Sequence, residues 1–112
     1  MKIQHSIQEQ VAVVTLDGDV THEQAESLRS VCRQCLSSRA RDIVLDMSKV
    51  LYVDSAGLEA MLDIQDQVAE VLGQMRLVGL CENLRTILRM TRLDVTFQSH
   101  EDMQTALESL KV

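Results

Sequence analysis

Proline, tryptophan and long apolar runs are absent from this sequence of 112 residues, and aromatic residues are nearly absent. Tyr52 and Phe97 are its two aromatic residues, so the core must be aliphatic and stacking platforms for nucleic-acid bases are lacking. Nothing marks a domain boundary, because there is no proline, no Gly/Ser-rich linker and no internal repeat. Residues 1–112 are therefore expected to form a single domain.

The sequence predicts neither a signal peptide nor a transmembrane helix. The longest apolar runs, Val11–Val14 and Val50–Val53, have four residues each, whereas a membrane-spanning helix needs about twenty. The N-terminal residues alternate between polar and apolar types and form no apolar run. We therefore expect a cytoplasmic protein that does not insert directly into a membrane.

Acidic residues outnumber basic ones, 17 to 11, which gives a formal net charge of −6. Nucleic-acid-binding domains normally carry a basic patch, so no nucleic-acid partner is expected. The 46% of hydrophobic residues is ordinary for a folded, soluble domain and excludes a disordered chain.

Metal, redox and nucleotide chemistry are poorly represented. Cys32 and Cys35 form a C-x-x-C pair, but they lie about three turns into a predicted helix, whereas a redox pair normally opens one. Two buried, reduced thiols are therefore expected. The three histidines match no zinc motif, and glycine-rich phosphate-binding motifs are absent. We expect no metal, no cofactor and no catalytic residue, so the chain is predicted not to be an enzyme.

Apolar strands alternate with amphipathic helices along the chain. Strands are predicted at residues 3–7, 11–16, 43–45, 75–80 and 95–97. Helices are predicted from a Thr21–Gln24 capping box to about residue 38, over 55–73 with Gly73 as the terminator, around 84–88, and after a Ser99-x-x-Asp102 capping signal. This order predicts an α/β fold with a mixed, mostly parallel sheet of about five strands, covered by about four helices.

The turn at Asp54-Ser55 is the candidate site, because sites in α/β sheets form where strands end and helices begin. Ser55 falls at or next to a helix N-cap, where free N–H groups and the helix dipole favour oxygen and negative charge. Gly57 removes a side chain from the first turn, which would let a partner approach the backbone. An ordinary Ser/Asp cap followed by a tolerated glycine remains the alternative explanation.

Two predicted helices carry opposite stripes of charge. Four acids recur at i, i+4, i+7 and i+11, namely Glu59, Asp63, Asp66 and Glu70. Three bases recur on the next helix at i, i+4 and i+7, namely Arg85, Arg89 and Arg92. Either the two helices are neighbours whose stripes pair, or the stripes form a docking surface for a charged partner. The sequence leaves both interpretations open.

The stretch Ile43–Leu58, which ends in Asp54-Ser55-Ala56-Gly57-Leu58, resembles the signature of the STAS domain, particularly that of anti-sigma factor antagonists. Leu16–Val20, Met75–Leu80 and Leu93–Phe97 resemble further parts of the family pattern, so the resemblance covers about residues 3–110. Arg92 takes a position that glycine often holds in the family. The resemblance implies a STAS-like fold and a function in partner switching during bacterial signalling.

In that family, the serine that follows the aspartate is phosphorylated by a serine kinase that is also an anti-sigma factor. The unphosphorylated antagonist binds and sequesters the kinase, phosphorylation blocks binding, and a phosphatase resets the switch, which regulates transcription. Carried over to this chain, Ser55 is the phosphorylated residue. The implied partner-binding residues are Asp17, Asp19, Thr21, Asp54, Ser55, Ala56, Gly57, Glu59 and Asp63. A homodimer stays open, and the alternative function is a cytoplasmic STAS subunit of a lipid or anion ABC-type transport system.

Overall fold

The computed structural model describes residues 1–111, which form an α/β fold built on one five-stranded sheet. The strands are β1 (Lys2–Gln8), β2 (Val11–Asp17), β3 (Asp42–Lys49), β4 (Met75–Val78) and β5 (Ser99–His100). The helices are α1 (His22–Ser38), α2 (Ser55–Glu70), α3 (Glu82–Met90) and α4 (Met103–Ser109). The predicted fold class, a mixed and mostly parallel sheet with four helices, is confirmed.

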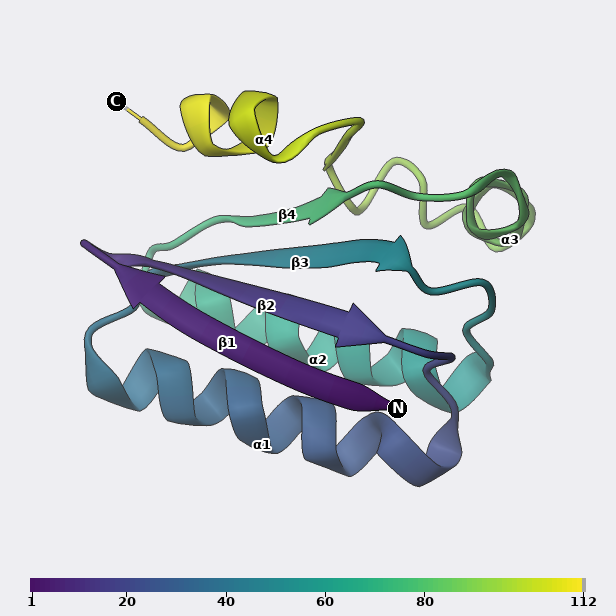
Figure 1. The fold of residues 1–112 in the computed structure, drawn as a ribbon, viewed down its shortest axis with the longest axis horizontal. Helices are drawn as coiled ribbons and strands as arrows, with labels where there is room; N and C mark the ends of the chain where they lie inside the picture. Colours follow the sequence, from purple (N-terminus) through teal and green to yellow (C-terminus); the bar gives the residue numbers. More distant parts are fainter. Residues whose placement is uncertain (112) are drawn as a thin grey trace.

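The sheet has the strand order β1-β2-β3-β4-β5 (Figure 1). β1 and β2 form an antiparallel hairpin, and every later neighbour in the sheet pairs in parallel. Parallel neighbours need a crossover, and a helix lies in each of the three connections. The carboxyl ends of β2 and β3 therefore meet at one end of the molecule, where α1 and α2 begin.

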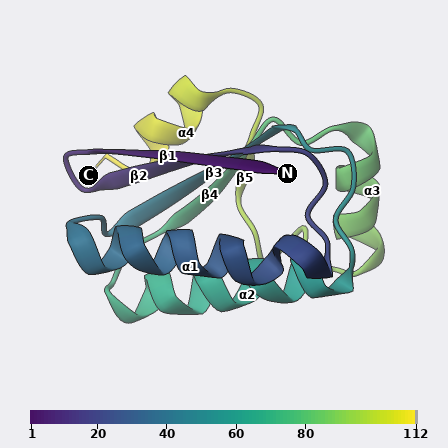
Figure 2. The ribbon, with the colours of Figure 1, turned by 60° about the horizontal axis from the view of Figure 1, so that its bottom comes forward.

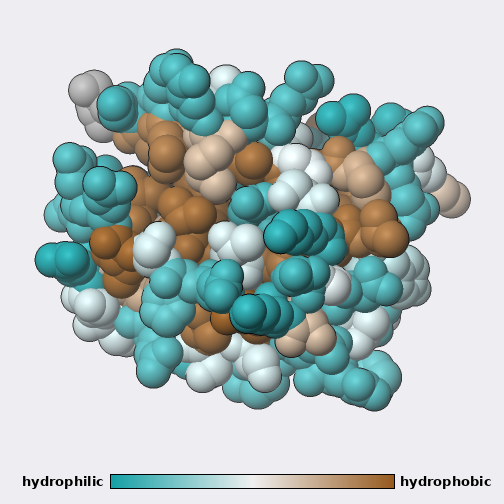
Figure 3. All heavy atoms as spheres, in the orientation of Figure 1, coloured by the Kyte–Doolittle hydropathy of each residue, from teal (hydrophilic) through white to brown (hydrophobic). Residues whose placement is uncertain are grey.

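The helices cover the sheet unequally. α1 and α2 lie side by side on one face, α4 covers part of the other face, and α3 lies beyond the end of the strands (Figures 1 and 2). The main core fills the space under α1 and α2, with Leu16, Leu45 and Ile64 fully buried. On the other face, a groove between α4 and the start of β2 is lined by Val11, Val13 and Leu107. Apolar side chains are visible on this side of the molecule in Figure 3.

Two local predictions are wrong. Residues 95–97 form a turn instead of a strand, with the Phe97 N–H bonded to the Leu93 carbonyl at 3.0 Å, and the last strand is β5. Phe97 is buried, but Val95 is 85% exposed, so the short apolar run does not enter the sheet. Ser99 consequently lies in β5, and Asp102 is itself the N-cap of α4, where it accepts from the Thr105 N–H at 2.8 Å.

The end of α2 is also not as predicted. The helix ends at Glu70, and the residue with a left-handed backbone after it is Leu72 (φ 61°), not Gly73. Gly73 is required for space, because an added Cβ would lie within 1.8 Å of the Arg41 carbonyl oxygen. Position 73 therefore needs glycine because the loop after α2 packs closely against the Arg41 backbone.

The paired cysteines behave as small apolar residues. Cys32 and Cys35 are free, and both are almost completely buried on the core side of α1. Burial, with a smaller contribution from Cys35, raises the pKa of Cys32 to about 12, so its thiol stays protonated. The predicted burial of the two thiols is confirmed.

Among residues 1–111, no helix is both long and apolar enough to cross a bilayer.

Candidate functional site

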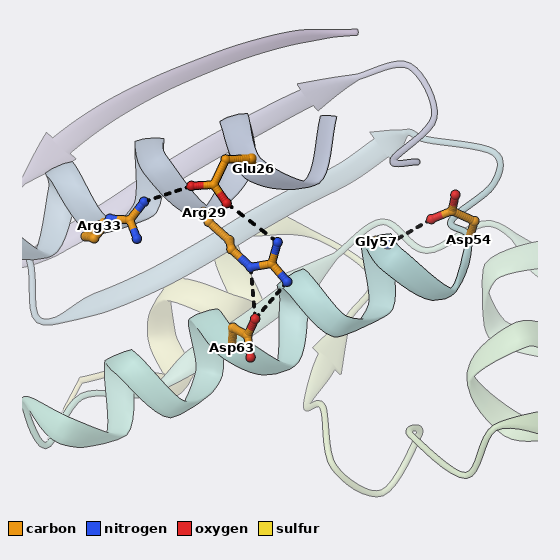
Figure 4. Close-up of polar contacts among 6 residues, drawn as sticks. All are labelled: Glu26, Arg29, Arg33, Asp54, Gly57 and Asp63. Atoms are coloured by element: carbon orange, nitrogen blue, oxygen red, sulfur yellow. Dashed lines mark hydrogen bonds and ion pairs between the residues drawn. The ribbon is translucent and has the colours of Figure 1, made fainter. Parts of the chain in front are cut away.

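Asp54 joins the N-termini of two helices with one carboxylate. As the N-cap of α2, it accepts the Gly57 N–H on Oδ1 at 2.8 Å (Figure 4), and it accepts the N–H of His22, the first residue of α1, on Oδ2 at 3.0 Å. The bond from Gly57 is the largest influence on the pKa of Asp54 and, with the bond from His22, lowers it. Asp54 therefore stays ionised and occupied by N–H donors at neutral pH.

A short parallel bridge holds the two connecting segments together beside this carboxylate. The Val20 N–H donates to the Tyr52 carbonyl, and the Asp54 N–H donates to the Val20 carbonyl, both at 3.1 Å. Gly57 packs directly against this bridge, since an added Cβ would lie 2.4 Å from the Val20 oxygen. The glycine thus makes room for Val20 within the chain, and the prediction that it opens the backbone to a partner is wrong.

Ser55 is the first residue of α2, and it is exposed. Its position next to the N-cap agrees with the sequence prediction, and the N-terminus of a helix favours added negative charge. Asp17 and Asp19 are exposed in the segment that the Val20 bridge holds beside residues 52–54. The bridge therefore brings the predicted loop and the predicted serine to one end of the molecule.

Thr21 fulfils the predicted role as the N-cap of α1. The Gln24 side-chain oxygen accepts the Thr21 N–H at 3.4 Å, as the predicted capping box requires, and it also accepts the Thr21 hydroxyl at 2.6 Å. Since His22 directly follows Thr21, this cap also fixes the N–H that reaches Asp54. Ala56, the neighbour of Ser55, is partly exposed on the same first turn of α2.

The acidic stripe of α2 is only partly free. Asp63 is held by α1, where Arg29 Nη2 and Nε lie 2.8 Å and 2.9 Å from its Oδ2 atom, and Arg29 also faces Glu26 (Figure 4). Glu59 is exposed one turn beyond Ser55. Of these two predicted binding residues, Glu59 keeps a free carboxylate among residues 1–111, whereas Asp63 is neutralised within the chain.

The stripes of α2 and α3 do not pair with each other. Within the described chain, no ion pair joins the two helices, and the base that meets the α2 stripe comes from α1. Arg85, Arg89 and Arg92 are exposed at the end of the molecule that α3 occupies. The interpretation in which these two helices neutralise each other is therefore wrong.

Three residues of this end of the molecule were missed by sequence reasoning. The His22 ring lies with Nδ1 3.8 Å from Asp54 Oδ2, although the two residues are distant in sequence. Leu51 and Tyr52 are 68% and 46% exposed in the segment that leads to Asp54. Leu51 and Tyr52 stand between two valines in one apolar run, a pattern that predicts burial, so no local signal marks these side chains as exposed.

The mixed sheet, with α1 and α2 tied together at their N-termini by one aspartate next to an exposed serine, defines a small α/β domain. The chain belongs to the STAS domain family, whose family model matches residues 2–106. The family predicted from the Ile43–Leu58 stretch is thereby confirmed.

Its similar proteins include anti-sigma factor antagonists. BtrV of Bordetella bronchiseptica, named as a candidate anti-sigma factor antagonist, is 25% identical over 99 residues, which are 88% of this chain and 85% of BtrV. A candidate anti-sigma factor antagonist of Thermotoga maritima has the same fold, with a TM-score of 0.89 and 21% identity over 96% of this chain and 93% of that chain. The phosphorylated form of the Bacillus protein SpoIIAA has a TM-score of 0.75 and 16% sequence identity, over 98% of this chain and 100% of that chain.

The fold also occurs in transport proteins. A sulfate transporter family protein of Wolinella succinogenes has a TM-score of 0.78 and 18% identity, over 94% of this chain and 88% of that chain. The fold alone therefore does not separate signalling from transport.

Proposed function

We propose that this chain is an anti-sigma factor antagonist that works by partner switching. In its unphosphorylated form it binds and sequesters a serine-kinase anti-sigma factor, which frees a sigma factor and so regulates transcription. The observation that carries this proposal is the exposed hydroxyl of Ser55 on the first residue of α2. It lies next to Asp54, the N-cap of that helix, and at the same end of the molecule as the Asp17–Thr21 segment. The names of BtrV and of the Thermotoga maritima relative, and the phosphorylated structure of SpoIIAA, support it.

The proposed switch is a phosphoryl transfer to Ser55. The serine Oγ attacks the γ-phosphorus of ATP, the bond from that phosphorus to the bridging oxygen breaks so that ADP leaves, and the hydroxyl proton passes to a base of the kinase. Phosphate adds a charge of about −1.5 to −2 and three acceptor oxygens. Ser55 lies between Asp54, the N-cap of α2, and Glu59, one turn further on. A phosphate here adds bulk and a strongly hydrated charge to the contact surface, which a closely packed partner would have to desolvate. A phosphatase would restore the hydroxyl.

The proposed docking surface comprises the exposed or partly exposed residues around Ser55. These residues are Asp17, Asp19, Thr21, Ala56 and Glu59. Asp54 and Gly57 act beneath it, because their polar groups and free space are used within the chain. Asp63 contributes through its pair with Arg29, which fixes α2 against α1.

The test is phosphorylation by a serine-kinase anti-sigma factor from the same genome, followed by mapping of the modified residue by mass spectrometry. We expect one phosphate on Ser55, none on the Ser55→Ala variant, and normal phosphorylation of Ser30→Ala, whose serine is exposed on α1. Ser55→Asp should bind the kinase at least tenfold more weakly, about 1.4 kcal/mol. Absence of phosphate on Ser55 together with unchanged binding of Ser55→Asp would refute the proposal.

The alternative function is a STAS subunit at the cytoplasmic side of a lipid or anion transport system, which the similarity to the Wolinella succinogenes protein favours. Stoichiometric co-purification with transporter subunits from detergent-solubilised membranes, without any kinase binding, would support this alternative.

A further inference from the structure

Leu51 and Tyr52 are exposed apolar side chains on a backbone that is fixed from both sides. The Leu51 carbonyl accepts from Asn83 Nδ2 of α3 at 2.8 Å, and the Tyr52 carbonyl accepts from the Val20 N–H at 3.1 Å. Val50 and Val53, which flank the pair, are 0% and 3% exposed. The buried valines and the two hydrogen bonds hold this segment in place, so the exposure of Leu51 and Tyr52 is built into the fold.

The pair lies at the same end of the molecule as Ser55. Tyr52 is three residues before Ser55, and its carbonyl is bonded to the Val20 bridge that also binds Asp54. The backbone of the pair is bonded to Asn83 of α3 on one side and to Val20, which ends the loop after β2, on the other. The exposed charges around the pair on that side are mostly acidic, namely Asp17 and Asp19 in the segment and Glu59 beyond Ser55. One base, Lys49, is exposed among them and pairs with Asp17 in the sheet register.

A tyrosine presented on a fixed backbone is the kind of feature that dominates protein interfaces. A segment whose backbone is already ordered loses less conformational entropy on binding, and the adjacent leucine adds apolar area that binding can bury. The acidic border adds orientation and association rate more than affinity. A complementary partner therefore has an apolar recess with basic groups along its rim.

We propose that Leu51 and Tyr52 form the apolar anchor of the face that contains Ser55, and that its occupant is the serine-kinase anti-sigma factor, through an apolar recess bordered by basic residues. This inference rests on the proposed function. The anchor supplies the affinity, and a phosphate on Ser55, three residues away, prevents the recess from closing over it through its bulk and tightly held water.

The test measures the affinity of that kinase for variants in a Ser55→Ala background, by isothermal titration calorimetry, so that phosphorylation cannot interfere. Tyr52→Ala and Leu51→Asp should each lower the affinity about 30-fold or more. The matched control is Leu72→Asp, since Leu72 is 88% exposed and lies about 25 Å along the helix axis from Ser55. It should change the affinity by less than about threefold. Thermal unfolding of each variant verifies that it is folded.

The outcomes separate this inference from the proposed function. If both anchor variants bind within about threefold of the parent while Ser55→Asp in the wild-type background weakens binding, the anchor is refuted and the function stands. The anchor is also refuted if Leu72→Asp loses as much affinity as Leu51→Asp. If the wild-type chain neither binds the kinase nor receives a phosphate, the proposed function fails, and the anchor fails with it.

Discussion

Asp54 uses both carboxylate oxygens on backbone N–H groups of two helices, which makes the junction dependent on its charge. The pKa of Asp54 is lowered in the folded chain, chiefly by the Gly57 N–H, and has its ordinary value in the unfolded chain. The stability that this charge contributes is therefore present above the ordinary pKa and is lost as the pH falls through the lower, folded pKa.

Replacing Asp54 with asparagine is expected to lower the free energy of unfolding near neutral pH, and to matter less in acid. Protonated Asp54 resembles asparagine, so the difference in the free energy of unfolding between wild type and Asp54→Asn in urea should be constant above the ordinary aspartate pKa and should shrink as the pH falls below it. Asp102→Asn is the matched control, because Asp102 caps α4 through one residue, Thr105, and joins no second helix. A difference between wild type and Asp54→Asn that stays constant with pH would contradict this account.

Gly57→Ala is expected to destabilise the fold even though alanine favours helices. Its Cβ would lie 2.4 Å from the Val20 oxygen and 2.7 Å from Val53 Cγ1, so the Val20 bridge would have to shift. Overpacking of this kind costs about 1–3 kcal/mol, measured as the change in the free energy of unfolding in urea. Ala69→Gly, at an exposed helical position, should cost about 1 kcal/mol for propensity alone. An unchanged stability of Gly57→Ala would show that the bridge yields freely.

The residues of the site that sequence predicted are those whose signals are local. Asp54 as a cap and Ser55 beside it follow from a short run of residue types at a helix start. The contact of Asp54 with His22 and the pair of Arg29 with Asp63 join residues more than 30 positions apart, so only the packing of α1 on α2 creates them. Gly57 was noticed, but its reason lies in Val20 on another segment.

At the scale of elements, α2 and α3 end in the same motif, and each places a non-glycine residue where glycine is preferred. After α2 the Gly73 N–H bonds to the Val68 carbonyl, and after α3 the Leu93 N–H bonds to the Leu88 carbonyl, at 2.9 Å and 2.8 Å. These are Schellman motifs, whose left-handed residue is Leu72 in one case and Arg92 in the other, both with φ 61°.

Leu72→Gly and Arg92→Gly should each stabilise the protein. A left-handed backbone costs a non-glycine residue about 1–2 kcal/mol, and the greater freedom of unfolded glycine offsets about 0.5–1 kcal/mol of that gain. The expected net increase in the free energy of unfolding is about 0.5–1 kcal/mol for each variant, measured in urea. Val71→Gly and Thr91→Gly are the controls, because their φ angles of −98° and −93° offer no such relief, and both should destabilise.

The helices and strands that could be predicted from the sequence are those with a clear apolar period. Strands such as β2 and helices such as α1 have apolar positions of clear period, and burial selects them. The predicted strand at residues 95–97 failed because a three-residue run has no period, and the adjacent turn after Arg92 directs Val95 into solvent. Gly73 was predicted to end α2 because glycine commonly ends helices, but the residue with the left-handed backbone is its neighbour Leu72.

At the scale of the whole molecule, the acidic residues behind the net charge of −6 are unevenly paired with bases. Arg29 neutralises Asp63, whereas the other acids of the α2 stripe are exposed and have no ion-pair partner among residues 1–111. The arginines that could have balanced them lie on α3, at the end of the strands. A basic partner that approaches α2 near Ser55 is therefore attracted by a surface that the fold leaves uncompensated.

Phosphorylation of Ser55 should change this surface without unfolding the domain. The added charge lies at the N-terminus of α2, where the helix dipole favours it, while the neighbouring ionised Asp54 opposes it. Because the two effects have opposite signs and the site is exposed, the free energy of unfolding should change by less than about 1 kcal/mol, measured by urea unfolding of the purified phosphoprotein. Ser55→Asp should behave similarly, and Ser30→Asp, within α1, serves as a control away from the junction. A cooperative loss of structure on phosphorylation would mean that the switch acts through conformation and not through the surface.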